Sequence, residues 1–262
     1  MSQAFTTANL QTLLAFPFRD TEWKKKFLVG SLVTIGSFII PFVPFAFVYG
    51  YQFQIMRRII VEKGEPFLPE WQDWNKLLLD GFKLLGVVMV FMLPILILFF
   101  GGYGLALVLP ILCGFFAAMS EQTGGTPDFM LTSMGLVSAG GMFACYGLAL
   151  LLAVPVGVVM PAILGHVVAT DQFSAAFRLR EWWAIFRANL GGFLLAFVLM
   201  MALSLVLSSV FTVLYCTIIL CCLVPVVMGP MTMYLLTIYG ALFGQVYRDG
   251  VEKLAGQGVT LG

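Results

Sequence analysis

The sequence predicts an all-α integral membrane protein, because its charges are confined to short segments between long apolar tracts. Of its 262 residues, 61% are hydrophobic and 10% are charged, whereas soluble domains carry about 25% charged residues. The mean hydropathy is +1.00. A membrane-spanning helix needs about 20 apolar residues. Four longer tracts contain no Asp, Glu, Lys, Arg or His: residues 27–56, 84–120, 129–165 and 190–247.

The remaining composition excludes several functional classes. A net charge of +1 argues against nucleic-acid binding, which requires a basic surface. Residues 1–14 are polar and uncharged, without the basic start of a cleaved signal peptide. We therefore expect the first apolar tract to direct membrane insertion.

The cysteines do not form a disulfide framework or a zinc-binding pattern. They lie in the apolar tracts, where free cysteine behaves as a small hydrophobic residue. The adjacent pair at 221–222 leaves a redox role open, but packing or lipid contact is the simpler interpretation. No cofactor is evident. The five residues are Cys113, Cys145, Cys216, Cys221 and Cys222.

The distribution of Lys and Arg predicts the topology, since basic residues in short loops mark the cytoplasmic side. Basic segments precede and follow tract 27–56, so this tract should enter the membrane and return. Proline interrupts helices, which makes residues 41–44, Pro-Phe-Val-Pro, the expected turn. Each arm would be short, so a shallow re-entrant hairpin is an alternative.

Segment 121–128 has two acids and no base, so we place it outside the cytoplasm. Tracts 84–120 and 129–165 then cross once each, with surplus residues near Gly101–Gly104, Pro110 and Gly140–Gly141. Tract 190–247 has room for two spans, with a turn around Cys222–Pro225 or as far as Pro230. The prediction is about six spans in three hairpins, with both termini cytoplasmic. Eight spans result if the middle tracts are themselves hairpins.

Each predicted hairpin follows a charged segment that contains tryptophan, a residue favoured at the membrane interface. These segments are residues 16–26, 66–83 and 171–189. The pattern predicts a repeated unit of an amphipathic interfacial segment and a hairpin. The whole chain would form one membrane domain. Its repeat-like units are residues 1–62, 63–165 and 166–250, followed by a C-terminal tail at 251–262.

The segment 66–83 has the clearest helical pattern. Trp71, Trp74, Leu78 and Phe82 are spaced by three or four residues, with Pro69 suited to the first turn. We expect a helix that lies in the membrane surface. Asp171 and Asp20 are the expected N-caps of the other two segments.

Two stretches, residues 15–30 and 68–85, resemble the hallmark segments of domain of unknown function 4013. This family comprises multi-pass membrane proteins of bacteria and archaea. The resemblance implies a prokaryotic protein in the inner (cytoplasmic) or an internal membrane, and it supplies no catalytic or ligand residues. The matching motifs are Pro17-Phe18, Asp20, Trp23, Arg57-Arg58, Pro69-Glu70-Trp71, Asp73-Trp74 and Asp80-Gly81.

The charged segments are the candidate site for a protein partner or an anionic lipid headgroup, although plain interfacial anchoring explains the same residues. The candidates are Arg19, Asp20, Trp23, Trp71, Asp73, Trp74, Asp80, Arg178, Arg180 and Arg187.

Other residues have simpler interpretations. His166 lacks an evident second ligand, so we expect a solvated interfacial ring. Glu121 and Asp128 fit an external loop. Gly240 and Gly244 form a small-residue motif that permits close helix packing, which we expect within this chain rather than in a dimer.

The sequence favours a non-enzymatic membrane subunit or scaffold that binds lipid, a cofactor or other membrane proteins. The alternative is a transporter or channel for an apolar or weakly polar solute. Coupling to protons or ions is disfavoured because the spans lack ionisable residues. An interfacial enzyme that uses Asp73, Asp80 or His166 ranks last, since no pair has a spacing that demands catalysis.

Overall fold

The computed structural model describes residues 7–37, 39–40, 42–120, 128–216 and 223–257, and these contain helices but no strand. Two of the elements are short 3-10 helices, η2 and η4. The order is α1 (Thr7–Ala15), η2 (Phe16–Arg19), α2 (Trp23–Gly36), α3 (Val43–Ile60), α4 (Trp74–Ser120), α5 (Asp128–Thr170), η4 (Phe173–Phe177), α6 (Leu179–Ala188), α7 (Leu190–Cys216) and α8 (Val224–Gly256).

The chain divides into two compact units. Unit 1 comprises Met1–Val88 and Val158–Gly262, and unit 2 comprises Met89–Gly157. The helices α4 and α5 contribute to both units, whereas the other elements belong to unit 1 alone. Each unit is described by itself below.

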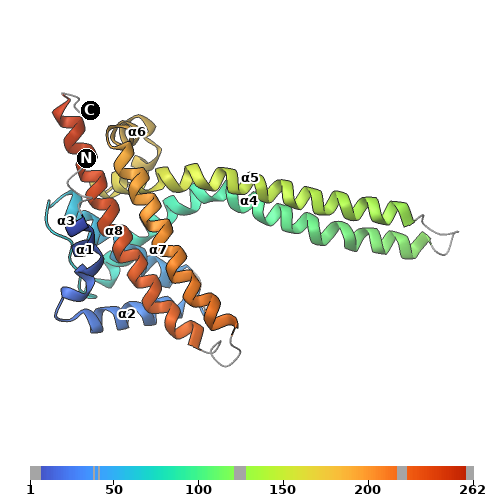
Figure 1. Ribbon diagram of the computed structural model, residues 1–262, viewed down its shortest axis with the longest axis horizontal. Helices are drawn as coiled ribbons and strands as arrows, with labels where there is room; N and C mark the ends of the chain where they lie inside the picture. The colour runs from blue at the N-terminus through green and yellow to red at the C-terminus, as the bar shows by residue number, and fades with distance from the viewer. Residues whose placement is uncertain (1–6, 38, 41, 121–127, 217–222, 258–262) are drawn as a thin grey trace. The chain divides into compact units, whose positions relative to one another are not determined.

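In unit 1, α8 is the helix around which the others gather, and α7 runs beside it (Figure 1). The α8 helix contacts α1, α2, α3, α6 and α7. Large aromatic side chains fill the interior, among them Phe53 of α3, Phe193 of α7 and Phe243 of α8, each at most 1% exposed. Close packing of such side chains, rather than their removal from water, is what holds apolar helices together in a membrane.

The glycines of the predicted packing motif lie on the side of α8 that faces α3. A Cβ at Gly240 would lie 3.2 Å from Cγ of Gln52, and one at Gly244 would lie 3.4 Å from Cβ of Ile59. The two helices therefore approach closely where the side chains of α8 are smallest.

Unit 2 is an antiparallel pair formed by the second half of α4 and the first half of α5. Phe99 stacks on Tyr146 with ring centroids 5.0 Å apart, and further along the pair Cys113 Sγ lies 3.1 Å from Met134 Sδ. Residue numbers rise on one helix as they fall on the other. The two helices therefore run antiparallel, and residues 121–127 between them lie outside the described residues.

Both long helices continue through the positions where we expected them to break. α4 has 47 residues and contains Pro94 and Pro110, and α5 has 43 residues and runs through Gly140 and Gly141. Proline removes one donor from a helix, but apolar helices tolerate it where neighbours satisfy the freed carbonyl. Neither middle tract folds back on itself over the described residues, which removes the basis for eight spans.

Four helices of the described chain are long and apolar enough to cross a membrane. They contain the windows Trp74–Phe116, Thr132–Thr170, Leu190–Leu214 and Val226–Gly256. The α2 and α3 helices have 14 and 18 residues and do not reach this level by length and hydropathy together. The predicted turn between them falls where α2 has ended and α3 begins, with Pro44 in the first turn of α3; Pro41 lies outside the described residues.

Candidate functional site

Every charged residue whose side chain the structure describes belongs to unit 1. Most of them lie at helix ends and in the connecting segments, where they form three polar clusters. Charges are costly in hydrocarbon, so these clusters are the natural place to look for a binding site. Glu121, at the predicted external loop, lies outside the described residues, as does the side chain of Asp128.

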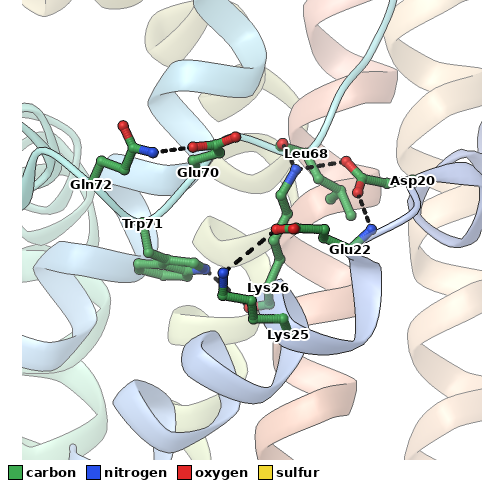
Figure 2. Close-up of polar contacts among 8 residues, drawn as sticks. All are labelled: Asp20, Glu22, Lys25, Lys26, Leu68, Glu70, Trp71 and Gln72. Carbon is green, nitrogen blue, oxygen red and sulfur yellow. Dashed lines mark hydrogen bonds and ion pairs between the residues drawn. The ribbon is translucent and has the colours of Figure 1, made fainter.

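The first cluster ties the start of α2 to the segment that precedes α4 (Figure 2). Lys26 Nζ donates to Asp20 Oδ2 at 2.7 Å and to the carbonyl of Leu68 at 2.9 Å. Trp71 donates its indole N–H to the carbonyl of Lys26 at 3.0 Å. The Lys26 side chain is 11% exposed, so its ammonium is held by protein groups rather than by water.

Asp20 accepts a second hydrogen bond, from the backbone N–H of Glu22 at 2.8 Å. The N–H group that it accepts lies just before α2. An N-cap would instead accept an N–H from inside the first turn of the helix, so the prediction that Asp20 caps α2 was wrong. Burial by itself raises the pKa of Asp20, but the hydrogen bonds from Lys26 and Glu22 outweigh it and lower the pKa below its ordinary value of 3.8. Asp20 is thus a carboxylate at neutral pH.

The two tryptophans of the second segment pack against α3. Trp71 stacks on Tyr51 with ring centroids 4.6 Å apart, and Trp74 meets Phe47 edge-on at 5.2 Å. The helix predicted from Pro69 onward begins only at Trp74, and α4 then continues far beyond residue 83. Pro66 and Pro69 disfavour a helix in this segment, and the indole of Trp71 gains tertiary partners instead.

The other predicted residues of this region do not converge on one point. The carbonyl of Asp73 accepts the first-turn N–H of Leu77 at 2.9 Å, while its side chain is exposed. Trp23 lies against Phe18 with ring centroids 5.2 Å apart. Arg19 lines a cavity of about 650 Å³ together with Glu65 and Arg248.

The second cluster is a chain of ion pairs around Lys83. Its Nζ lies 3.1 Å from Asp80 Oδ1 and 2.6 Å from Asp171 Oδ1, and Arg57 reaches Asp171 Oδ2 at 3.4 Å. The hydrogen bond from Lys83, with help from Arg57, lowers the pKa of Asp171. The carboxylate of Asp171 is occupied by these cations, and the backbone of this residue has a φ of 57°. Asp171 therefore does not cap a helix, contrary to the prediction.

Asp80 is buried, and its neighbour Gly81 explains how it comes to lie there. A Cβ on Gly81 would collide with the carbonyl of Ala46, and one on Gly50 would collide with the carbonyl of Leu77. The backbones of α3 and α4 therefore touch at this crossing. The contact carries Asp80 into the interior at 4% exposure, where Lys83 pairs with one of its two oxygens.

The third cluster joins α5, α6 and α8 through His166. Its Nδ1 lies 2.9 Å from Tyr247 Oη, and its Nε2 lies 2.9 Å from Glu181 Oε2. Because a carboxylate only accepts, Nε2 carries a proton, and the neutral ring then accepts the Tyr247 hydroxyl at Nδ1. His166 is 3% exposed. The expectation of a solvated ring was wrong, since two partners distant in sequence enclose it.

A cavity of about 510 Å³ lies beside this third cluster, and we call it the His166 cavity. Its lining combines the His166, Glu181 and Tyr247 chain with three cations, Lys63, Arg178 and Arg248. Apolar side chains complete it, including those of Ile60 and Val251. Glu181 and Tyr247 are absent from the residues that the sequence predicts, because separations of 15 and 81 residues carry no local signal.

The predicted arginines of the third segment have different surroundings. Arg178 donates to Gln172 at 2.8 Å and lies 3.8 Å from Glu181. Arg180 and Arg187 are exposed and make no ion pair with any residue that the structure describes. The opposite side of α6 is buried through Trp182, Ile185 and Phe186.

The described residues contain no group of three or more His, Cys, Asp and Glu side chains able to hold a metal ion. Cys113, Cys145 and Cys216 are free thiols, and the adjacent pair Cys221 and Cys222 lies outside the described residues. The His166 chain can hold and relay a proton.

The all-helical fold, the four long apolar helices and the charged side chains of unit 1 define a membrane-type protein in which every charged side chain that the structure describes belongs to one compact unit. Residues 33–222 match the family model described as "Protein of unknown function (DUF4013)". Because the match covers well over half of the chain, the protein belongs to the DUF4013 family. No curated protein and no solved structure matches it.

Proposed function

We propose that the protein is a non-enzymatic subunit or scaffold of a prokaryotic inner or internal membrane, and that it binds lipid or another membrane protein through unit 1. The observation that carries this proposal is the His166 cavity. Lys63, Arg178 and Arg248 outnumber the acids Glu181 and Glu252 in its lining, and apolar walls lie beside them. Such a lining suits an acidic headgroup or an acidic segment of a partner.

Catalysis is the weaker explanation for the same residues. Asp80 is paired with Lys83, and the side chain of Asp73 is exposed elsewhere. Of the three candidate acid–base residues, His166 alone lines the His166 cavity. Acid–base work requires groups that can reach one substrate together, and these three do not share a site.

Transport of a solute also receives little support from the polar groups of the apolar helices. In α7, the hydroxyls of Ser208, Ser209 and Thr212 donate to carbonyls three or four residues earlier in the same helix. In α2, Ser31 and Thr34 do the same. Hydroxyls that satisfy their own helix do not offer a solute a polar path.

For the membrane arrangement, we propose three hairpins with both termini in the cytoplasm. The basic segments carry this proposal. The exposed apolar residues Ile39, Ile40 and Phe42, between α2 and α3, support entry of the first hairpin into hydrocarbon. Helices of 14 and 18 residues extend about 21 and 27 Å, against a hydrocarbon core of about 30 Å. A re-entrant first hairpin therefore stays the alternative to six full spans.

The order of elements also supports the proposed repeat of an interfacial segment and a helical pair. The pairs are α2 with α3, α4 with α5, and α7 with α8, and each follows a tryptophan-bearing segment. We propose the repeat-like units 1–62, 63–165 and 166–250, with 251–262 as the tail, although α5 and α8 run a few residues past the last two boundaries.

The long pair formed by α4 and α5 supports a protein partner. The charge-free part of α4, residues 84–120, extends about 55 Å, well beyond the thickness of a bilayer core. Many of its apolar side chains are exposed, such as Ile97, Phe100 and Phe116. If the helices tilt, lipid can cover more of this apolar surface. We propose that another membrane protein covers part of the rest.

Purification in a mild detergent tests the proposal. We expect the protein to retain lipid or a partner, and Arg178→Gln to weaken that retention while Arg180→Gln, outside the His166 cavity, leaves it unchanged. Native mass measurement of the purified species is the readout. A chain that always migrates alone and free of lipid would overturn the proposed function.

Labelling of single cysteines from either side of the membrane tests the topology. Glu65→Cys and Ser174→Cys should react from the cytoplasmic side and Thr126→Cys from the opposite side. Reaction of the first two from different sides would contradict the hairpin arrangement and the repeat.

A further inference from the structure

The His166 cavity lies where three of the four charge-free tracts end. Ile60 follows the first tract by four residues, and His166 and Arg248 directly follow the third and fourth tracts. All three side chains line the cavity. The ends of membrane-spanning apolar tracts lie at the level of the lipid headgroups, so a headgroup is the group within closest reach of this cavity.

The charged side chains of the cavity add up to a charge of +1 while His166 is neutral. Three are cations and two are acids, so one negative charge on a ligand balances them. A phosphodiester carries one negative charge, and its oxygens accept hydrogen bonds from Lys and Arg. A zwitterionic headgroup would bring an ammonium among these cations. The charged residues are Lys63, Arg178, Arg248, Glu181 and Glu252.

The two arginines have acid neighbours and still keep free donors. Arg178 Nη1 lies 3.8 Å from Glu181 Oε2, and Arg248 Nε lies 4.0 Å from Glu252 Oε1. Both distances exceed that of a hydrogen bond. Arg178 donates to Gln172, which occupies one of the five N–H donors of a guanidinium. Both arginines can therefore bind a phosphate oxygen without first losing a short ion pair.

Lys63 is the cation of the cavity that has no acid partner. It is exposed and makes no ion pair with any residue that the structure describes. It follows α3 with a φ of 52°, in the left-handed region where glycine is usual after a helix. The lysine at this position places an uncompensated ammonium beside the cavity, just past the end of the first charge-free tract.

His166 and Arg178 share one carboxylate oxygen. His166 Nε2 lies 2.9 Å from Glu181 Oε2, and Arg178 approaches the same oxygen at 3.8 Å. A protonated His166 would pair with this carboxylate and weaken its attraction for Arg178. The Tyr247 hydroxyl can both donate and accept, so it can turn to accept from the second N–H of the imidazolium. Protonation thus adds one positive charge to the cavity and releases Arg178 toward a ligand.

The chain contains one histidine, so the proton that sets the charge of the cavity is identifiable. The ordinary pKa values of Glu, Tyr, Lys and Arg lie outside the range of about pH 5–8, whereas that of His lies within it. The other titratable and charged groups that line the cavity are Lys63 after α3, Arg178 and Glu181 at the start of α6, and Tyr247, Arg248 and Glu252 of α8.

We propose that the His166 cavity binds the phosphodiester group of an acidic phospholipid, and that protonation of His166 strengthens this binding. The phosphate lies against Lys63, Arg178 and Arg248, and the glycerol end of the lipid lies against the apolar wall that includes Ile60 and Val251. The inference rests on the proposed lipid-binding function and makes its ligand and its regulation specific.

The experiment uses the full chain, delipidated in detergent, and three ligands. They are a phosphoglycerol lipid, a phosphocholine lipid with the same acyl chains, and soluble glycerophosphoglycerol, and displacement of a fluorescent phosphoglycerol lipid gives their affinities. We expect the phosphoglycerol lipid to bind at least about fivefold more tightly than the other two. Equal binding of the two lipids would overturn the inference, and equal binding of the soluble diester would show that the ligand is not a lipid.

A matched pair of lysine variants tests the location of the site. Lys63→Gln should lower the affinity for the phosphoglycerol lipid about fivefold, the effect of one cation near a membrane surface. Lys76→Gln removes the same charge from an exposed lysine that does not line the cavity, and it should leave the affinity unchanged. Equal effects of the two variants would mean that the lipid responds to overall charge, contrary to the proposed site.

The regulation is tested by measuring the same affinity at about pH 8 and about pH 5. The charge of a phosphodiester does not change in this range. We expect the affinity to rise about fivefold toward pH 5 in the natural protein and to stay constant in His166→Gln. Glu181→Gln removes the acid that holds Arg178, so it should bind more tightly than the natural protein at pH 8, a gain that misfolding cannot produce. A pH dependence that persists in His166→Gln, or weaker binding by Glu181→Gln, would overturn the role of His166.

The outcomes also distinguish this inference from the proposed function. If the protein retains other lipids or a partner but does not prefer the phosphoglycerol lipid, the inference fails and the proposed function survives. If it binds no lipid and no partner, both fail.

Discussion

Trp71 and Lys26 lie 45 residues apart in the chain and are joined by a hydrogen bond from the indole N–H to the main-chain carbonyl, with 3.0 Å between Nε1 and O. The same indole stacks on Tyr51, so one side chain connects the segment before α4 to both α2 and α3.

Trp71→Phe should keep most of the ring contact and lose the donor. We expect it to lower the free energy of unfolding by about 0.5–1.5 kcal/mol, measured by denaturation in detergent.

Trp74→Phe is the matched control for this variant. The indole of Trp74 makes no hydrogen bond with any described residue, and its ring meets Phe47 edge-on. It should therefore change stability less than Trp71→Phe does. Equal losses would show that ring size, rather than the hydrogen bond to Lys26, is what matters.

The crossing of α3 and α4 should not tolerate a side chain at Gly81. Gly81→Ala places a methyl group against the carbonyl of Ala46, and overpacking of this kind costs about 1–3 kcal/mol. Gly104→Ala in the same helix has no atom within 4 Å of the added carbon. It should leave the melting temperature unchanged or raise it, because alanine favours helix. A tolerated Gly81→Ala would argue against the close crossing.

Replacing Lys83 alone should lower the stability of the protein more than replacing both Lys83 and Asp80. Lys83→Met leaves a buried carboxylate without its partner, a change that costs about 3–5 kcal/mol at fully buried sites and less here, since Lys83 is 30% exposed. Adding Asp80→Asn to Lys83→Met should recover part of the loss. Thermal unfolding of the two single variants and the double variant measures this. Additive losses would contradict the pairing.

The chain of His166 and Tyr247 predicts strong non-additivity between the two residues. Tyr247→Phe leaves the buried Nδ1 of His166 without a donor, which costs about 1–3 kcal/mol. In the presence of His166→Leu, the same Tyr247→Phe change should cost much less. The four proteins of this double-mutant cycle, compared by unfolding in detergent, should give a coupling of about 0.5–3 kcal/mol. Zero coupling would mean that the two side chains do not share the hydrogen bond.

The lowered pKa values of Asp20 and Asp171 predict a loss of stability in acid. Both folded-state pKa values lie below the ordinary value of 3.8. Their contribution is therefore fully present above pH 3.8 and is lost as the pH falls through the lower folded-state values. Asp20→Asn and Asp171→Asn should each flatten the dependence of melting temperature on pH in this range. Unchanged slopes would contradict the ion pairs with Lys26 and Lys83.

Much of the architecture was predictable because hydrophobicity is a local property of the chain. The charge-free tracts predicted long apolar helices, and α4, α5, α7 and α8 are such helices. The charged segments predicted where polar groups gather. The start of α4 was predicted incorrectly, since the spacing of Trp71 and Trp74 fits a helix face that the structure does not form at residue 71.

The partners of individual polar residues were not predictable in this way. No local pattern around His166 indicates that Glu181 and Tyr247 are its partners. In the same way, nothing near Asp171 in the sequence indicates its ion pair with Lys83. Such contacts depend on which helices pack together. Packing in turn depends on glycines such as Gly81, whose role appears only where two backbones meet.

The helical class, the long apolar helices and the gathering of charges in short segments could all be read from the sequence, because each follows from the types and spacing of neighbouring residues. The pairing of the charges, the enclosure of His166 and the contact between the backbones of α3 and α4 at Gly81 all depend on how the helices pack. Those features are contacts between distant segments, and burial, which gives them their energy, exists only once the helices have packed.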